Sequence, residues 1–188
     1  MSIEIEKLET LHKGWNTFSI ATIRLEDGVR ITRAIEDHGN AVCVLPYDPM
    51  RKCAILVRQF RAPVYLASKA LDNLEVVAGL MDEDEPEETA RREAMEEAGL
   101  KLGALEPVAS VWAMPGSSTE RMDLFLVPYT EADRIGDGGG LDHEHERITV
   151  VEMPLAQLAE MAETGAIADM KTLALVQTLR LRKPELFR

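Results

Sequence analysis

The stretch Gly79-Leu-Met-Asp-Glu-Asp-Glu85-Pro-Glu-Glu-Thr-Ala-Arg-Arg92-Glu93-Ala-Met-Glu96-Glu97-Ala-Gly99-Leu100 is the most informative part of this 188-residue chain. Its second half predicts a helix, because proline suits a first helical turn at Pro86 and glycine suits the left-handed residue after the last turn at Gly99. At 3.6 residues per turn, three glutamates fall on one face of this helix. They are Glu93, Glu96 and Glu97.

Alanines that repeat every four residues predict a narrow apolar stripe beside these glutamates: Ala90, Ala94 and Ala98. Like charges at i,i+4 destabilise an isolated helix by roughly 0.2–0.5 kcal/mol per pair. A bound cation would relieve this repulsion, and carboxylate oxygens are ligands that Mg²⁺ prefers. The helix therefore predicts a magnesium site on its acidic face. An ordinary solvated acidic helix is the alternative.

The same stretch resembles the signature of the Nudix hydrolases, Gly-x5-Glu-x7-Arg-Glu-U-x-Glu-Glu-x-Gly-U, in which U is a bulky aliphatic residue. The match covers Gly79, Glu85 and the block from Arg92 to Leu100. The chain departs from the signature in two places, since only six residues separate Glu85 from Arg92 and Ala94 occupies the first U position. The resemblance implies the Nudix fold, a mixed β-sheet sandwiched between α-helices.

The similarity extends over nearly the whole chain. Residues 56–61, 114–120 and 164–172 resemble the Nudix branch that hydrolyses nucleoside diphosphate sugars. Within that branch, the chain looks most like enzymes that split GDP-mannose into GMP and mannose 1-phosphate, and next most like ADP-ribose pyrophosphatases. A Nudix-fold module that senses a nucleotide sugar without cleaving it is the alternative of another class. Such modules typically lose carboxylates of the signature, and this chain keeps all of them in the helix.

Composition bounds the class of protein. Hydrophobic residues make up 46% of the chain, which suits one compact domain, and the formal net charge of −12 argues against nucleic acid as a partner. The sequence shows no signal-peptide pattern and no apolar run of about 18 residues, so we expect a cytoplasmic protein that does not cross a membrane. Cys43 and Cys53 lie in apolar runs and are expected to be buried thiols.

Strand patterns interleaved with helical patterns predict the α/β class. An N-terminal β-hairpin is expected over residues 17–36, with its turn at residues 26–28. Further strands are expected at residues 41–46, 53–60, 75–78, 105–114, 122–129 and 148–153, and helices at 155–164 and 171–182. We expect residues 1–38 to form an N-terminal strand extension and residues 39–188 to form the Nudix hydrolase domain.

A two-stranded hairpin cannot bury both of its faces, so the apolar side chains of residues 18–31 need a further surface. The resemblance places that surface on a second copy, because members of this branch are typically homodimers that exchange N-terminal strands and complete each other's substrate sites. Under this interpretation, Trp15 stacks on the base and Arg33 faces the nucleotide. Packing of Trp15 in the core is the alternative.

Two of the helical glutamates, Glu93 and Glu97, lie one turn apart and are expected to bind the metal, with Glu96 sharing the site. The resemblance adds the carbonyl group of Ala78 as a ligand. Mg²⁺, which Mn²⁺ can replace, would neutralise the diphosphate and lower the pKa of the attacking water. Arg92 can reach Glu96 at i,i+4 and hold its carboxylate in place; a plain surface salt bridge is the alternative.

A general base is expected on the charged, glycine-rich loop that spans residues 136–146. Counting back from Ile148 favours Glu146 in the family's position for a catalytic glutamate linked to the metal. Glu144 is the second candidate. We interpret His143 and His145 as solvated loop residues rather than as a base or a zinc-binding pair.

Further substrate contacts are expected from three side chains outside the helix. Arg61 would bind phosphate through its guanidinium group, with a solvated strand-end arginine as the alternative. Lys171 opens the last helix, and Glu120 follows a Pro-Gly loop that could cover the sugar. A solvated lysine and an ordinary turn carboxylate are their alternatives. We refer to the signature, residues 79–100, as the Nudix box. The resemblance adds four residues around the start of this box or before the candidate base: Ala78, Gly79, Leu80 and Gly140.

Overall fold

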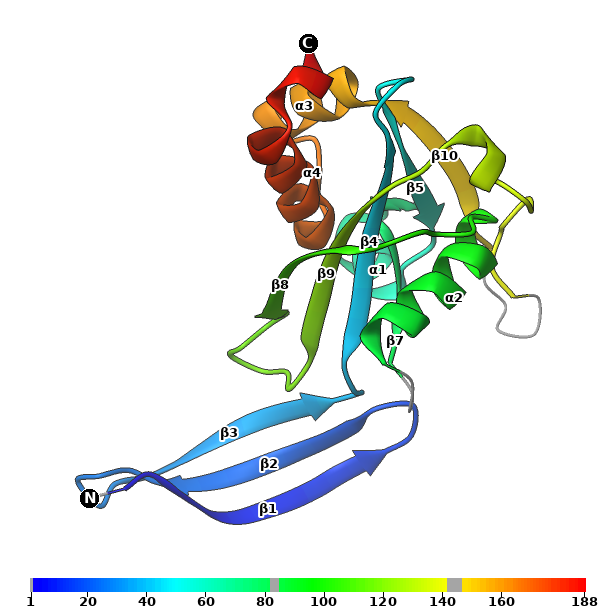
Figure 1. Ribbon diagram of the computed structural model, residues 1–188. Coiled ribbons are helices and arrows are strands. Elements are labelled where there is room, and N and C mark those ends of the chain that lie inside the picture. Colours follow the sequence, from blue (N-terminus) through cyan, green and yellow to red (C-terminus); the bar gives the residue numbers. More distant parts are fainter. Residues whose placement is uncertain (1, 82–84, 142–146) are drawn as a thin grey trace. The chain divides into compact units, whose positions relative to one another are not determined.

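The computed structural model of the protein describes residues 2–81, 85–141 and 147–188. Its first five elements are strands, and helices are interspersed among the later strands, in a mixed α/β order (Figure 1). In order they are β1 (Glu4–Lys13), β2 (Thr17–Arg24), β3 (Arg30–Asp37), β4 (Ala41–Asp48), β5 (Cys53–Gln59), α1 (Ala62–Ser68), β6 (Asn73–Glu75), β7 (Val77–Leu80), α2 (Pro86–Ala98), β8 (Glu106–Trp112), β9 (Arg121–Pro128), η1 (Glu131–Asp133), β10 (Thr149–Pro154), α3 (Leu155–Thr164), α4 (Met170–Arg182) and η3 (Pro184–Phe187).

A seven-stranded sheet has the order β10-β5-β4-β9-β8, with β6 paired to β5 and β7 paired to β4. Successive residues of a strand point to opposite faces, and both faces of β4 are buried. Val42 and Val44 pack in one core cluster with the alanines of α2. Cys43 and Leu45, between and beyond them, are equally buried. Figure 1 shows α2 on one side of these strands and α3 with α4 on the other, which confirms the predicted sandwich.

The predicted N-terminal hairpin is confirmed by β2 and β3, which pair antiparallel. Gly28 closes their turn at a φ of 84°, and the Leu25 amide donates a hydrogen bond of 2.8 Å to the Val29 carbonyl group. Glycine adopts a left-handed φ at little cost, so Gly28 explains why the turn forms where it was expected, at residues 26–28. Five of the six further predicted strands and both terminal helices are confirmed, with bounds that differ by a few residues.

The first strand, β1, was not predicted, and its sequence pattern explains why. Its apolar residues recur every three positions, at Ile5, Leu8 and Leu11, whereas a regular strand alternates every two. The pairing of β1 with β2 has register shifts after Ile5 and after Thr10. Each shift inserts one residue, so Ile5 and Leu8 come to the same side of the sheet in spite of their odd spacing.

Two other elements differ from the sequence prediction. Helix α1 was missed because it is only seven residues long and nearly all of them are apolar, so its sequence has no polar face to reveal a helical period. The strand expected at residues 75–78 is divided between β6 and β7 at Val76. The Val76 amide donates a hydrogen bond of 2.8 Å to the Thr172 hydroxyl group instead of to a neighbouring strand.

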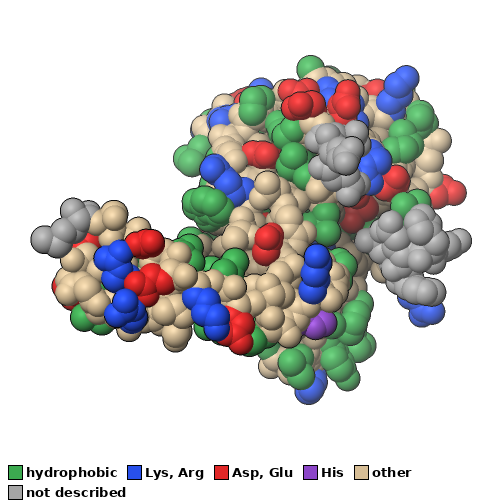
Figure 2. Space-filling view, turned by 90° about the horizontal axis from the view of Figure 1, so that it is seen from below, with side chains coloured by type: hydrophobic (Ala, Val, Ile, Leu, Met, Phe, Trp, Pro, Cys, Tyr) green, Lys and Arg blue, Asp and Glu red, His purple; other side chains and the backbone are tan. Residues whose placement is uncertain are grey.

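The chain divides into two compact units, which comprise residues 1–41 with 110–122 and residues 42–109 with 123–188. The first unit contains the three-stranded sheet β1-β2-β3 and the loop between β8 and β9. Basic and acidic side chains lie next to one another on that sheet (Figure 2), where Arg24 and Arg30 both pair with Glu6. The assignment of residues 1–38 to an N-terminal extension and of residues 39–188 to the hydrolase domain stays a prediction.

Both cysteines are free and buried, as predicted. The sulfur atom of Cys53 lies 3.6 Å from the Tyr129 hydroxyl oxygen, and burial raises the pKa of the Cys53 thiol, so this group is held in its unreactive protonated form. Among the residues that the structure describes, no helix combines the length and the apolar character needed to cross a membrane.

Candidate active site

Helix α2 carries the acidic face that the sequence predicted. Proline begins the helix and Gly99 follows its last turn at a φ of 66°, as expected. The alanine stripe is fully buried in the core cluster of the sheet, and this packing fixes the rotation of the helix about its axis. In that orientation Glu97 is only 2% exposed, whereas Glu93 and Glu96 are partly open to solvent.

Two consecutive residues of β7 meet two of these carboxylates. The Ala78 amide donates a hydrogen bond of 3.1 Å to Oε2 of Glu97. The next residue, Gly79, lies so close to Glu93 that a Cβ atom at this position would sit 2.0 Å from the Glu93 Cδ atom. The structure therefore brings Ala78, Gly79, Glu93 and Glu97 together, as the sequence proposed. Leu80 follows in the same strand and is half-buried.

Arg92 lies between two carboxylates of the helix. Its guanidinium nitrogens are 3.2 Å from Oε1 of Glu93 and 3.7 Å from Oε2 of Glu96. The expected contact with Glu96 is present, and the contact with Glu93 was not foreseen. Because one planar guanidinium group faces both side chains, Arg92 limits the directions in which they can point.

The glycine-rich loop packs on the C-terminal end of α2. The amides of Gly139 and Gly140 donate hydrogen bonds of 2.9 and 3.1 Å to the carbonyl groups of Glu97 and Glu96. Gly138 approaches so closely that a Cβ atom there would lie 2.4 Å from the Glu97 carbonyl oxygen. The glycines thus satisfy carbonyl groups that a helix end leaves unpaired.

The two described ends of the charged loop meet at this position. The Ile148 amide donates a hydrogen bond of 3.3 Å to the carbonyl group of Gly139, which in turn binds the end of α2. The candidate bases and their neighbours lie outside the described residues: His143, Glu144, His145 and Glu146. Their assignment stays a prediction.

The donor set of this region fits a hard divalent cation. Glu93 and Glu97 supply carboxylate oxygens beside the backbone of residues 78–79, and hard cations prefer oxygen ligands. Within residues 2–81, 85–141 and 147–188, no group of three or more His, Cys, Asp or Glu side chains is placed to hold an ion by itself. A further carboxylate, as the sequence expected from residue 146, would complete such a set.

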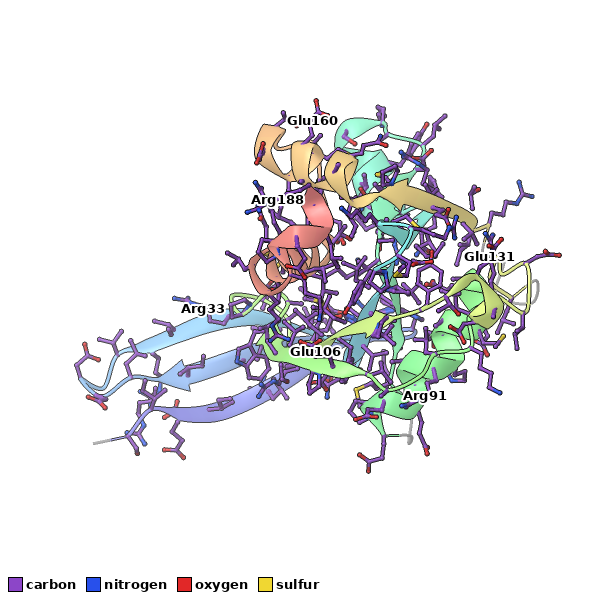
Figure 3. The ribbon with its side chains drawn as sticks, turned by 45° about the horizontal axis from the view of Figure 1, so that its top comes forward. Arg33, Arg91, Glu106, Glu131, Glu160 and Arg188 are labelled. Carbon is purple, nitrogen blue, oxygen red and sulfur yellow. The ribbon has the colours of Figure 1, made fainter. Side chains whose placement is uncertain are left out.

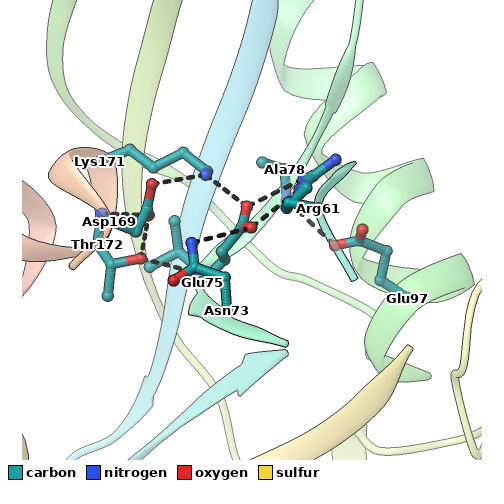
Figure 4. Close-up of polar contacts among 9 residues, drawn as sticks. Arg61, Asn73, Glu75, Ala78, Glu97, Asp169, Lys171 and Thr172 are labelled. Carbon is teal, nitrogen blue, oxygen red and sulfur yellow. Dashed lines mark hydrogen bonds and ion pairs between the residues drawn. The ribbon is translucent and has the colours of Figure 1, made fainter. Parts of the chain in front are cut away.

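A second cluster, unforeseen as a unit, surrounds the buried carboxylate of Glu75 (Figure 4). Arg61 donates to it through Nε and through a terminal nitrogen, at 2.9 and 3.0 Å. Lys171 donates to Oε2 at 2.6 Å and to Asp169 at 2.9 Å. Asn73 adds a hydrogen bond of 3.3 Å. We refer to these five residues as the Glu75 cluster.

The Glu75 cluster unites two residues that the sequence proposed for substrate binding, Arg61 and Lys171. The alternative of a solvated lysine is wrong, because the Lys171 side chain is 14% exposed and pairs with two carboxylates. Arg61 is 42% exposed but is held by a two-bond contact, so a freely solvated arginine is also wrong. Sequence reasoning missed Glu75, although a carboxylate within the apolar run Leu74–Ala78 was a visible signal.

The charges of this cluster are mutually supporting. Burial alone would raise the pKa of Glu75, but the hydrogen bond from Arg61 and the charge of Lys171 outweigh it and lower that pKa to about 2. Burial likewise opposes the charge of Lys171, but Glu75 and Asp169 raise the pKa of its ammonium group. Both cations and the Glu75 carboxylate are therefore charged at neutral pH.

Trp15 and Arg33 belong to the first unit. Trp15 is 74% exposed, so the alternative of core packing does not hold for this chain. Its ring stacks on His38, with centroids 5.0 Å apart and an interplanar angle of 16°. Arg33 lies on β3 (Figure 3), exposed, and donates to the Thr32 carbonyl group at 2.8 Å. Contact of either side chain with a substrate stays a prediction.

The remaining candidate, Glu120, belongs to a polar network in the same unit. Its carboxylate lies 3.6 Å from Nε2 of His38, whose Nδ1 atom lies 2.7 Å from Glu36. Glu36 also accepts hydrogen bonds from Ser118 and Asn16. Together with the larger contribution of His38, these bonds outweigh the effect of burial and lower the pKa of Glu36. Glu120 is thus more than an ordinary turn carboxylate, and sequence reasoning missed Glu36 and His38.

The model of the NUDIX domain matches residues 37–176, which is most of the chain and includes the whole box. The chain belongs to the Nudix family. Within that family it is 38% identical to a GDP-mannose pyrophosphatase of Cronobacter sakazakii over 189 aligned residues, which cover 97% of this chain and 98% of the relative. It is 37% identical to GDP-mannose pyrophosphatases of Escherichia coli O1:K1 and of Shigella flexneri, with 81% of this chain and 80% of each relative covered.

A solved structure supports the Nudix fold for the whole length. It is described as an ADP compounds hydrolase and superposes with a TM-score of 0.78, covering 98% of this chain and 96% of that chain, at 19% sequence identity. The predicted α/β sandwich with its N-terminal hairpin is confirmed by this likeness and by the strands and helices themselves. Nudix hydrolases generally need a divalent metal ion, which the donor set at Glu93 and Glu97 suits.

The close approach of Gly79 to Glu93 in the Nudix box leads to a prediction for Gly79→Ala. The new methyl group would collide with the flexible end of Glu93, which can swing away without disturbing the backbone. We therefore expect an unchanged unfolding temperature and an affinity for the divalent metal that is about tenfold weaker, as measured by metal titration of the activity.

Gly103→Ala is the matched control, because a Cβ atom at Gly103 meets no atom within 4 Å. It should leave metal affinity and unfolding temperature as they are. Equal metal affinities in the two variants would contradict the assignment of Glu93 as a ligand displaced by the methyl group.

Proposed function

We propose that the protein is a cytoplasmic Mg²⁺-dependent pyrophosphohydrolase that cleaves the diphosphate of a nucleoside diphosphate sugar, with GDP-mannose as the favoured substrate. Water attacks one phosphorus atom of GDP-mannose and the phosphorus–oxygen bond of the anhydride breaks, which yields GMP and mannose 1-phosphate. Similarity over nearly the full length to proteins named GDP-mannose pyrophosphatase supports this substrate. ADP-ribose is the competing substrate.

One observation carries the proposal. Two box carboxylates, Glu93 and Glu97, face consecutive residues of β7, and the same chain segment carries Glu75 with its two cations. Oxygen donors for a divalent metal and positive side chains for phosphate therefore both lie against one short strand segment, residues 75–79. A diphosphate is the kind of ligand that requires both.

The metal would be held by the carboxylates of Glu93 and Glu97, by the carbonyl group of Ala78 and by Glu146. Bound Mg²⁺ neutralises phosphate charge and lowers the pKa of a coordinated water molecule. Arg92 restrains Glu93 and Glu96, which keeps the carboxylates in place before the metal arrives. Mn²⁺, with similar preferences for oxygen ligands, would replace Mg²⁺.

The remaining roles fall to protein groups outside the helix. Glu146 would accept the proton of the attacking water as general base. Arg61 and Lys171 would bind the oxygens of the diphosphate, and Gly79, Leu80 and Gly140 would line the same site through their backbones. Trp15, Arg33 and Glu120 would contact the base, the nucleotide and the sugar.

A coupled phosphatase assay tests this function. Alkaline phosphatase releases no phosphate from an intact nucleotide sugar, whose phosphates are both esterified, but it hydrolyses GMP and mannose 1-phosphate. With Mg²⁺ we expect phosphate release from GDP-mannose. Because alkaline phosphatase is itself a metalloenzyme, metal dependence is measured without it, as loss of GMP formation in EDTA and its return with excess Mg²⁺ or Mn²⁺. Chromatography should identify GMP and mannose 1-phosphate when the phosphatase is omitted.

The same assay separates the alternatives. A higher kcat/KM for ADP-ribose than for GDP-mannose would transfer the assignment to an ADP-ribose pyrophosphatase. Binding of GDP-mannose in calorimetry, without hydrolysis of any nucleotide sugar in the panel, would identify a sensor instead of an enzyme.

We further propose that the protein acts as a homodimer in which the N-terminal strands serve the partner's substrate site. Every residue of β1 is exposed in the single chain, and Ile5, Leu8 and Leu11 are each more than half exposed. An exposed edge strand with apolar side chains favours association with a further surface. A second copy of the chain would supply that surface.

Deletion of residues 1–38 should therefore lower the mass measured by light scattering and raise KM together. A matched control replaces Lys7 and Glu9 by glutamine, because it removes an exposed ion pair of β1 and keeps the apolar side chains. The control should remain dimeric with an unchanged KM. A truncated chain that stays dimeric with wild-type kinetics would refute the shared site.

A further inference from the structure

The carboxylate of Glu75 has an environment unlike that of an ordinary ion pair. It is 2% exposed and accepts hydrogen bonds from Arg61, Lys171 and Asn73. The pair Arg58–Asp72 on the same part of the chain provides the contrast, because both of its partners are about half exposed. Burying a charged group is costly, and apolar replacements of buried ion pairs often preserve stability. Stability is therefore a poor reason for placing a carboxylate at Glu75.

The cations that meet at Glu75 come from distant parts of the sequence. Arg61 directly precedes α1. Because no residue of α1 is buried, the packing of this helix does not fix the position of Arg61. Lys171 lies in the first turn of α4, next to the N-cap residue Asp169. Arg61 and Lys171 both donate to Oε2 of Glu75, which brings two positive nitrogens together at one oxygen atom. Their mutual repulsion is offset by the charge between them.

The cluster is tied to the Nudix box through the backbone. Glu75 ends β6, and three residues later the Ala78 amide binds the carboxylate of Glu97 (Figure 4). Between them, the Val76 amide binds the hydroxyl group of Thr172, which neighbours Lys171. Residues 75–78 thus fix the positions of both cations with respect to the box carboxylates.

We infer that Glu75 is a positioning residue, which holds Arg61 and Lys171 together as one binding unit for the diphosphate of the substrate. Glu75 itself is too deeply buried to serve as a surface contact, whereas Arg61 reaches the surface. A pre-organised pair of cations binds phosphate without first having to be ordered. This inference rests on the proposed function, since a nucleoside diphosphate sugar is the ligand concerned.

The test is Glu75→Gln, which keeps the size of the side chain and removes its charge. We expect KM for GDP-mannose to rise by about tenfold with kcat changed much less, because a phosphate contact made in both ground state and transition state is weakened. Calorimetry with inorganic pyrophosphate in EDTA should show a matching loss of affinity. Glu75→Asp, which restores the charge, should recover part of both, and Asp72→Asn should behave as wild type.

Several outcomes would overturn the inference. They are a folded Glu75→Gln variant with wild-type KM and pyrophosphate affinity, a wild type that binds no pyrophosphate, and an Asp72→Asn variant with the same defect. If the wild type cleaves no nucleotide sugar but binds pyrophosphate in a manner that depends on Glu75, the proposed function fails and the binding unit stands. The two conclusions are therefore separable.

A second comparison applies if Glu75→Gln does not fold. The double variant Glu75→Gln with Lys171→Gln removes one charge of each sign and avoids leaving two cations without their common partner. If Glu75 positions Arg61, the double variant should have a KM about tenfold above that of Lys171→Gln alone. Equal values for the double and the single variant would overturn the role of Glu75 toward Arg61.

Discussion

Glu97→Gln should lower kcat by about three orders of magnitude and leave the fold intact. Glu97 is 2% exposed and accepts a hydrogen bond of 3.1 Å from the Ala78 amide. The carbonyl oxygen of glutamine can accept the same bond, so the substitution removes a charge while preserving this contact. The charge is what a divalent cation requires, and its loss should also appear as weaker metal binding in calorimetry.

The stability of the metal-free protein gives this prediction a second measurement. Glu93 and Glu97 are like charges one turn apart, and removing one of them relieves roughly 0.2–0.5 kcal/mol of repulsion. The unfolding temperature of Glu97→Gln without metal should equal or slightly exceed that of the wild type. A generally damaged helix would instead unfold earlier.

Glu87→Gln is the matched control on the same helix. Glu87 is exposed in the first turn of α2 and pairs with Arg91, which lies on the outer side of the helix (Figure 3). This variant should keep full activity. A folded Glu97→Gln variant with wild-type kcat would contradict the assignment of the box glutamates as metal ligands.

The box could be predicted because its information is local. Helix limits follow from Pro86 and Gly99, and the buried stripe follows from a four-residue spacing. These are properties of neighbouring residues, so they survive any change in the tertiary arrangement. The same reasoning predicted β2 and β3, where the turn at Gly28 and the alternation of side chains agree.

The Glu75 cluster could not be predicted in the same way. Glu75 and Lys171 are 96 positions apart, and no spacing rule links them. Arg61 was proposed as a phosphate ligand and Lys171 as a separate substrate contact, whereas their common partner becomes visible only when β5, β6 and α4 are packed together. Strand β1 escaped for a different reason, because its two register shifts replace the alternation on which strand prediction depends.

The two described ends of the charged loop are anchored at the Nudix box, which bears on the choice of the general base. The glycines before residue 141 bind the end of α2, and the Ile148 amide returns to Gly139. Both described ends of the charged loop thus lie next to the backbone of Glu96 and Glu97. A base supplied by this loop is consistent with those two anchors, and counting back from Ile148 favours Glu146 over Glu144.

Glu146→Gln should lower kcat by about 10²–10⁴-fold with little change in substrate affinity, because a general base acts mainly in the transition state. Glu144→Gln is the matched control, with the same chemical change two residues away, and should have a milder effect. Measurement of kcat and KM for both variants at saturating Mg²⁺ separates them. If Glu144→Gln is the more damaging of the two, the register through the loop is shifted by two residues and Glu144 is the base. Nearly wild-type kcat in both variants would place the base elsewhere in the chain, since neither carboxylate could then be accepting the proton of the attacking water.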